Sequence, residues 1–164
     1  MGGTLLVSGS DKGRDFLAQL LKENTGLPVQ PVTVVTSGDE ARRLLGMGME
    51  EYDLILINGP VISELGHHLA VYAAESTTSA VVLMVKAEMA DDVEAQVEEY
   101  GVLVLAKPFA KPLFFQTIRL ALTARRRMLG LKNENVHLQQ KIEEIRLVDR
   151  AKCVLIQYLG LTEP

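Results

Sequence analysis

The sequence predicts an α/β fold in which five parallel β-strands form one sheet with helices on both faces. Short apolar runs alternate five times with helical patterns along the first two thirds of the chain. Each run is almost continuously apolar, as expected for a strand that is buried on both faces of a sheet. The connections are short, which favours parallel βα units joined by right-handed crossovers.

The order of these elements is simple. The expected strands are residues 4–8, 32–36, 53–58, 80–86 and 102–106. The helical patterns between them cover residues 12–24, 39–46, 63–74 and 91–100. Ser37 introduces a turn before the second helix, and Ser63 is the expected cap of the third. In such open sheets a binding site lies at the carboxyl ends of the strands. The residues at those ends are Ser8, Gly9, Asn58, Lys86 and Lys107.

A fifth helix is expected from Lys111 to about Leu159, because this stretch is rich in helix formers and has no Pro after Pro112. Apolar residues in its middle follow alternating spacings of three and four, which indicates a coiled-coil seam. Asn135 occupies an a position, where Asn favours a parallel, in-register dimer. The seam consists of Met128, Leu131, Asn135, Leu138, Ile142 and Ile145. A surface helix with one apolar stripe is the alternative to this homodimer.

Charge is distributed unevenly. Residues 1–118 contain 8 Lys/Arg and 16 Asp/Glu, whereas residues 119–152 contain 9 Lys/Arg and 4 Asp/Glu. A basic helix can bind nucleic acid, or it can simply be a solvated face. The chain has no apolar run long enough to cross a membrane, and its single cysteine, Cys153, is typical of a reducing compartment. These features predict a cytoplasmic protein without a membrane partner.

Residues 4–123 resemble the receiver domain of response regulators, which has a flavodoxin-like sheet. The resemblance rests on Leu6-Val7 with Arg14, on the run from Asp53 to Asn58, and on Lys107-Pro108-Phe109. It implies an acidic pair that holds a divalent cation, an Asp that accepts a phosphoryl group, a hydroxyl residue and a Lys. Those positions read Ser8 and Gly9, Asn58, Lys86 and Lys107 here, so only the last is retained.

The substituted residues cannot perform the chemistry of the family. An amide nitrogen is not a nucleophile for phosphoryl transfer, and Ser8 and Gly9 offer no charge to attract magnesium. The sequence therefore predicts no metal, no cofactor, no catalysis and no phosphorylation. Lys86 and Lys107 either reach solvent and bond to loop carbonyls and Asn58, which is the favoured interpretation, or bind an anionic ligand.

The last residues resemble the beginning of an ANTAR domain, an RNA-binding antiterminator module. The resemblance rests on Ala151-Lys152, Leu155-Ile156 and the four residues from Gly160 to Glu163. It implies a pseudo-receiver at 1–123, a coiled-coil helix at 124–150 and a truncated ANTAR domain at 151–164.

The predicted function is regulation of transcription antitermination. The full-length protein would bind an RNA hairpin, and this chain alone would bind it weakly or not at all. Arg125, Arg126, Arg127 and Lys152 are the candidates for contact with RNA. The alternative is a non-enzymatic dimeric scaffold in which the acidic receiver docks a regulatory protein.

Overall fold

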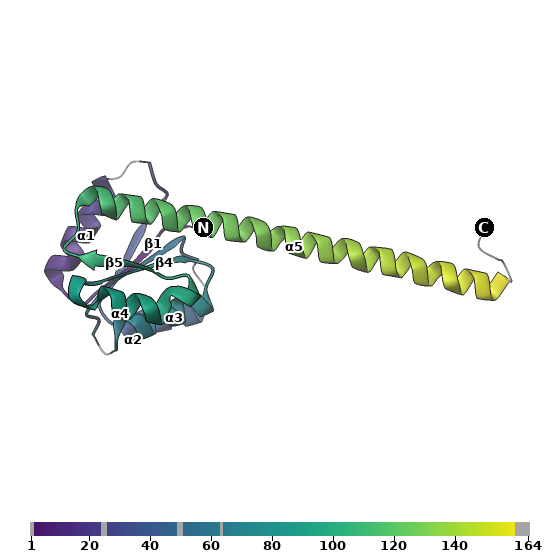
Figure 1. Cartoon of the computed structure of the whole chain (residues 1–164), viewed down its shortest axis with the longest axis horizontal. Helices are drawn as coiled ribbons and strands as arrows, with labels where there is room; N and C mark the ends of the chain where they lie inside the picture. The colour runs from purple at the N-terminus through teal and green to yellow at the C-terminus, as the bar shows by residue number, and fades with distance from the viewer. Residues whose placement is uncertain (1, 24–25, 49–50, 63, 160–164) are drawn as a thin grey trace. The chain divides into compact units, whose positions relative to one another are not determined.

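The described strands form one five-stranded parallel sheet with the strand order β2-β1-β3-β4-β5. Figure 1 shows this sheet among the helices α1 to α4. The computed structural model describes residues 2–23, 26–48, 51–62 and 64–159, and the side chains of 132 and 143–159 lie outside the description. The sequence-based prediction of the fold class is confirmed. The elements in chain order are β1 (Thr4–Ser8), α1 (Asp11–Glu23), β2 (Val32–Val35), α2 (Gly38–Met47), β3 (Leu54–Asn58), α3 (Gly66–Ser76), β4 (Ala80–Lys86), α4 (Ala87–Val97), the 3-10 turn η1 (Glu98–Tyr100), β5 (Leu103–Lys107) and α5 (Lys111–Leu159).

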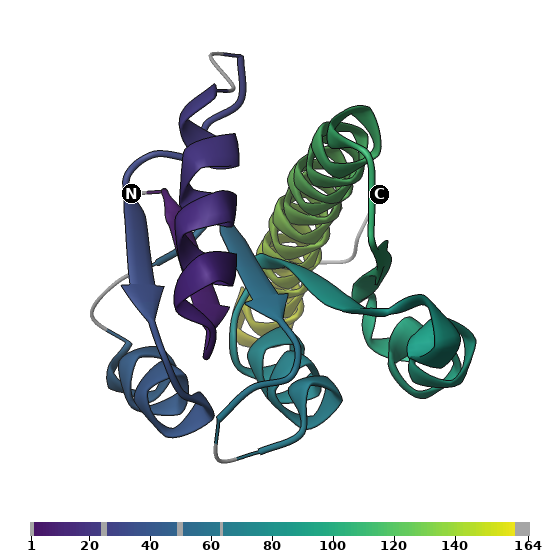
Figure 2. The same cartoon turned by 90° about the vertical axis from the view of Figure 1, so that its left-hand side faces the viewer.

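Alternate residues of the strands face two separate apolar cores. Leu5, Val7, Ile55 and Ile57 point to the face that is covered by α2, α3 and α4. The opposite face is covered by α1 and by the beginning of α5, as Figure 2 shows. Its core includes Phe114, which is completely buried. Burial of both faces explains why the strands are almost continuously apolar in sequence.

Two helix starts differ from the prediction. The helix α4 begins at Ala87, directly after β4, and not at residue 91. Ala87 and Ala90 are strong helix formers and no turn residue separates them from the strand. The helix α3 begins at Gly66 after an extended Leu65, which provides no side-chain cap. Ser63, the expected cap, lies outside the described residues.

The chain divides into two compact units, Met1–Arg126 and Arg127–Pro164. The first, hereafter the receiver unit, contains the sheet, α1–α4 and the start of α5. Within it, Arg125 forms an ion pair with Asp53, with 3.1 Å between Nη1 and Oδ1, and donates from Nε to the Thr78 carbonyl at 2.9 Å. The second unit contains the remainder of α5. No described helix has the length and apolar character of a membrane span.

Candidate functional site

The strand register brings the predicted site residues together at one edge of the sheet. Ser8 on β1 pairs with Asn58 on β3, and Lys86 on β4 pairs with Lys107 on β5. All four residues end their strands. Parallel strands present their carboxyl ends at the same edge of the sheet, so the four residues gather there. Gly9 follows β1 directly and is half-buried.

A chain of hydrogen bonds links three of these residues. The Lys107 ammonium donates to Asn58 Oδ1 at 2.8 Å and to the Gly59 carbonyl. Asn58 Nδ2 donates to Ser8 Oγ at 3.1 Å, and the Ser8 hydroxyl donates to the Ser10 carbonyl at 3.3 Å. Both polar atoms of the Asn58 side chain are therefore engaged, and the side chain is only 9% exposed.

The first turn of α1 closes one side of this network. Arg14 donates from Nη1 to the Ser8 carbonyl at 3.1 Å and forms an ion pair with exposed Asp11. Gly13 allows the helix to approach closely, because a Cβ there would lie 2.6 Å from Asn58 Nδ2 and 3.1 Å from Ser8 Oγ. Asp11, the acidic residue nearest to Ser8 in the sequence, thus forms its ion pair with Arg14 of its own helix.

The site carries positive charge without a matching carboxylate. Lys107 is half-buried, and burial lowers the pKa of its ammonium group below the usual value, with a further lowering from the charge of Lys86. Lys86 is exposed and makes no ion pair with any residue in the described ranges. Lys107 bonds to Asn58 and to a loop carbonyl, as the favoured interpretation of the sequence predicts. Lys86 remains available to a ligand.

Two cavities open beside the network. The first, of about 520 Å³, is hereafter the lysine cavity, and it is lined by Gly13, Phe16, Leu17, Asn58, Lys86, Lys107, Pro108 and Phe109. The second, of about 460 Å³, lies toward Gly9 and the loop after β3. The lining of the lysine cavity contains two cationic side chains and no acidic one.

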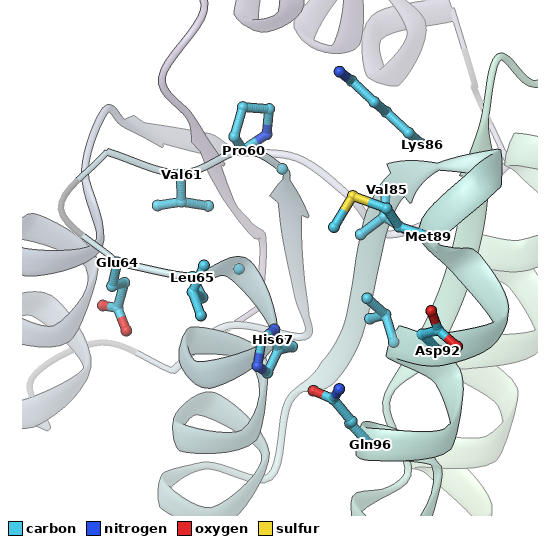
Figure 3. A pocket seen from close by; sticks show the side chains of 13 residues that line it. Pro60, Val61, Glu64, Leu65, His67, Val85, Lys86, Met89, Asp92 and Gln96 are labelled. Atoms are coloured by element: carbon cyan, nitrogen blue, oxygen red, sulfur yellow. The ribbon is translucent and has the colours of Figure 1, made fainter.

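A third hollow lies between α3 and α4, and Figure 3 shows it from close by. Val61, Leu65, Val85 and Met89 form its apolar wall. The Lys86 side chain borders this groove but extends away from the apolar wall, as Figure 3 shows. Its charge therefore does not lie within the groove.

The polar group at the end of β3 is the Asn58 amide, and an amide is not a nucleophile for phosphoryl transfer. No carboxylate stands where a nucleophile would be, since the Asn58 amide occupies that place and is held between Lys107 and Ser8. Magnesium is usually bound through carboxylate and phosphate oxygens. In the part of the chain that the structure describes, no three His, Cys, Asp or Glu side chains gather in a way that could hold a metal ion.

Comparison with known proteins finds a relative among transcriptional regulators and solved structures with the same fold. No family model matches the chain. The chain is 28% identical over 148 residues to the transcriptional regulatory protein PdtaR of Mycobacterium tuberculosis, and the match covers 90% of this chain and 70% of that protein. The signal receiver domain of an HD domain-containing protein from Pseudomonas fluorescens Pf-5 superposes with a TM-score of 0.66 at 20% identity, covering 79% of this chain and 92% of that one. The chain has the receiver fold.

A further structure with this fold provides a useful contrast. The receiver domain of a sensor histidine kinase from Pseudomonas aeruginosa PAO1 has a magnesium ion coordinated in its active-site cleft. It superposes with a TM-score of 0.58 at 16% identity, over 75% of this chain and 99% of that domain. Together these similarities support a protein of the response-regulator type.

The predicted seam lies in the second unit. Met128, Leu131, Leu138 and Ile142 are each about half exposed, at 52%, 55%, 57% and 49%, and Asn135 is exposed as well. The Ile145 side chain lies outside the described residues. One helix therefore displays an apolar stripe with a polar residue at its centre, as a helix that pairs with another helix would.

The four RNA-contact candidates have different environments. Arg125 is bound to Asp53 and Thr78 inside the receiver unit, so its cation is engaged in holding the start of α5 against the sheet. Arg126 and Arg127 are exposed. The side chain of Lys152 lies outside the described residues. The prediction for Arg125 is revised, because its guanidinium is already paired.

Three contributors to the site were not predicted from the sequence. Gly13 provides the close approach of α1, and Phe16 and Phe109 form apolar walls of the lysine cavity. Phe109 follows the Lys-Pro pair, so its position near the site could have been inferred from its place at the end of β5. Nothing in the sequence marks Phe16, because a helix residue that faces a cavity looks the same in the sequence as one that faces solvent.

Proposed function

We propose that this protein is a non-enzymatic regulator of transcription antitermination, of the response-regulator type, whose receiver unit does not accept a phosphoryl group. The observation that carries the proposal is the Asn58 amide, which occupies the end of β3 and bonds to both Lys107 and Ser8. An amide in this position is not a nucleophile for phosphoryl transfer, whereas a carboxylate can be. Control of the protein must then come from a ligand or from association.

RNA binding is the proposed output. The support is the resemblance of the last residues to the beginning of an ANTAR domain, together with the exposed cations Arg126 and Arg127. Cations on a helix attract phosphate groups and make binding sensitive to salt. The name of the mycobacterial relative, a transcriptional regulatory protein, agrees with an output at the level of transcription.

A hairpin RNA titration of the protein tests this output. The double variant Arg126→Gln/Arg127→Gln should weaken RNA binding and reduce its salt dependence, because two phosphate contacts are lost. The matched control, Arg119→Gln, removes an exposed cation from an earlier turn of α5 within the receiver unit. The absence of RNA binding, or equal effects of both changes, would contradict the proposed output.

Pairing of two copies through the seam is the proposed means of placing two output modules together. A stripe of four half-exposed apolar side chains is costly to leave in water, and each of them would stabilise a dimer on burial. Asn135 favours the parallel, in-register arrangement. Two RNA-binding modules gain avidity when both can engage at once.

Sedimentation of the whole chain as a function of concentration tests this pairing. Leu138→Glu places a charge in the seam and should shift the chain toward the monomer, whereas Gln140→Glu introduces the same charge at an exposed f position and should not. A parent chain that remains monomeric at high concentration would rule out the dimer.

A protein-interaction scaffold is the second candidate function. The helix α4 exposes Glu88, Asp91, Asp92 and Glu94, so the receiver unit presents an acidic surface that could attract a basic partner. In this case the protein would have no role in RNA binding. Salt-sensitive RNA binding that disappears in Arg126→Gln/Arg127→Gln would argue against it.

A further inference from the structure

We propose that the lysine cavity binds a small organic anion, with the negative group between Lys86 and Lys107 and a flat apolar body against Phe16 and Phe109. This inference rests on the proposed function only in requiring that the receiver unit is not phosphorylated, and it is independent of the RNA output. It assigns a chemical class to the input signal of the protein.

The charge of the cavity is the first support. Two lysines end neighbouring strands in register, and no acidic side chain lines the cavity. Asp11, which is near in sequence, is already paired with Arg14. An ammonium group that is half-buried and close to a second cation is unfavourably placed, and an anion between them would relieve both the burial and the repulsion. The lowered pKa of Lys107 agrees with this environment.

The available donors suit a carboxylate or phosphate group. Lys107 already bonds to Asn58 Oδ1 and the Gly59 carbonyl, and an ammonium group has three protons to donate. Lys86 also lines the cavity and makes no ion pair within the described part of the chain, so its ammonium group is available to the anion. Hydrogen bonds between an ammonium group and an oxyanion are among the stronger ones in proteins.

The apolar walls define the rest of the ligand. Phe16 is 49% exposed and its ring centroid lies 6.4 Å from that of Phe109, which stacks in turn on Phe114. The Phe109 ring is thus fixed by packing, whereas one side of Phe16 remains uncovered. A cavity of about 520 Å³ is within the usual range for small-molecule sites. A planar apolar group against these rings would cover surface that is now in contact with water.

The neighbouring α3–α4 groove does not compete for the same ligand. Glu64 in that groove is bound by Arg42, with Nε and Nη2 at 2.8 and 2.7 Å from its two carboxylate oxygens. Asp92 adds a second negative charge to the lining. Figure 3 shows that Lys86 points away from the apolar wall of the groove, and its ammonium group can therefore serve the lysine cavity.

Titration calorimetry of the whole chain with phenyl phosphate and with benzoate tests the proposal. Benzyl alcohol serves as the neutral probe and inorganic phosphate as the probe without an apolar body. We expect saturable binding of at least one aromatic anion, no comparable binding of benzyl alcohol, and weaker binding of inorganic phosphate than of phenyl phosphate. Saturation by neither aromatic anion, or equal binding of the neutral probe, would overturn the proposal.

Matched variants locate the site. Lys86→Gln should weaken binding of the aromatic anion about tenfold, because one charge-assisted contact is lost. Lys22→Gln removes an exposed cation from the last turn of α1 and should leave binding unchanged. Phe16→Ala should reduce the preference for phenyl phosphate over inorganic phosphate. Equal effects of Lys86→Gln and Lys22→Gln would place the anion elsewhere and refute the inference.

The failure of the inference is distinguishable from that of the proposed function. The intact mass of the chain is recorded after the titration with phenyl phosphate. A covalently added phosphoryl group would contradict the proposed function itself. An unchanged mass together with no saturable binding would overturn only the anion site.

Discussion

Replacement of Asn58 by Asp tests whether the site is as deficient in negative charge as the structure indicates. The substitution keeps the shape of the side chain and places a carboxylate where the amide now accepts from Lys107 at 2.8 Å. The amide donor to Ser8 is lost, and the Ser8 hydroxyl can rotate away from the Ser10 carbonyl, to which it now donates at 3.3 Å, and donate to the new oxygen instead. We expect Asn58→Asp to stabilise the fold at neutral pH.

The magnitude follows from two opposing contributions. Opposite charges about 4 Å apart attract by roughly 4 kcal/mol at an effective dielectric constant of about 20. Burying the carboxylate costs several kcal/mol. The desolvation of Lys107 has already occurred in the parent protein, so that cost is not added again. We therefore expect a net gain of about 1 kcal/mol in the free energy of unfolding, roughly the equivalent of a pKa shift of about one unit.

The sign of the pH dependence follows from the same charges. The Lys107 ammonium should hold the pKa of the introduced carboxyl group below the unfolded value of about 3.9. The added stability is then fully present above that value and is lost as the pH falls through the lower folded pKa. Urea unfolding of the parent and of Asn58→Asp at neutral and acidic pH measures this difference.

Gln116→Glu is the matched control, since it adds the same charge at an exposed position of α5 and should change stability by less than about 0.5 kcal/mol. Destabilisation by Asn58→Asp at neutral pH would refute the reasoning, because it would mean that Lys107 gains nothing from a nearby negative charge.

Three further predictions concern the approach of α1 to the site, the start of α5 and a histidine of α3. Gly13→Ala should destabilise the fold by roughly 1–3 kcal/mol, because its Cβ would lie 2.6 Å from the site amide, whereas Gly130→Ala should stabilise α5 by about 1 kcal/mol in open surroundings; equal effects in urea unfolding would contradict the close approach of α1. Arg125→Ala should cost about 1–3 kcal/mol through its lost ion pair and carbonyl bond, and Arg126→Ala less than about 0.5 kcal/mol; similar losses in thermal unfolding would mean that Arg125 is not specifically held. Partial burial and the neighbouring His68 charge lower the pKa of His67, so the folded state favours the neutral imidazole. The stability that depends on this neutral form should be complete above a pH of about 6.5 and decline as the pH falls through the folded pKa. An NMR titration midpoint of His67 at or above about 6.5 would contradict this prediction.

The strands were predictable because burial on both faces leaves a continuous apolar run in the sequence. The ends of β1 and β4 agree with the prediction. The starts of α3 and α4 were not predicted correctly, since local signals at a helix start compete with the geometry of the preceding strand end. Lys86 is both the last residue of β4 and the N-cap of α4, so no turn residue marks the start of the helix.

The polar residues of the site were predictable for a related reason, since parallel strands bring their carboxyl ends to the same edge. Their hydrogen bonds were only partly predictable. The bond from Lys107 to Asn58 was anticipated as one alternative. The pairing of Arg125 with Asp53 was not, because it joins residues far apart in the sequence that come together only when the start of α5 packs on the sheet. No local pattern distinguishes Arg125 from exposed Arg126 and Arg127.

Incubation of the chain with acetyl phosphate and magnesium, followed by measurement of the intact mass, tests the central claim most directly. The Asn58 amide at the end of β3, and a lysine cavity whose described lining contains no acidic side chain, predict an unchanged mass after prolonged incubation. A stoichiometric gain of one phosphoryl group would contradict the account.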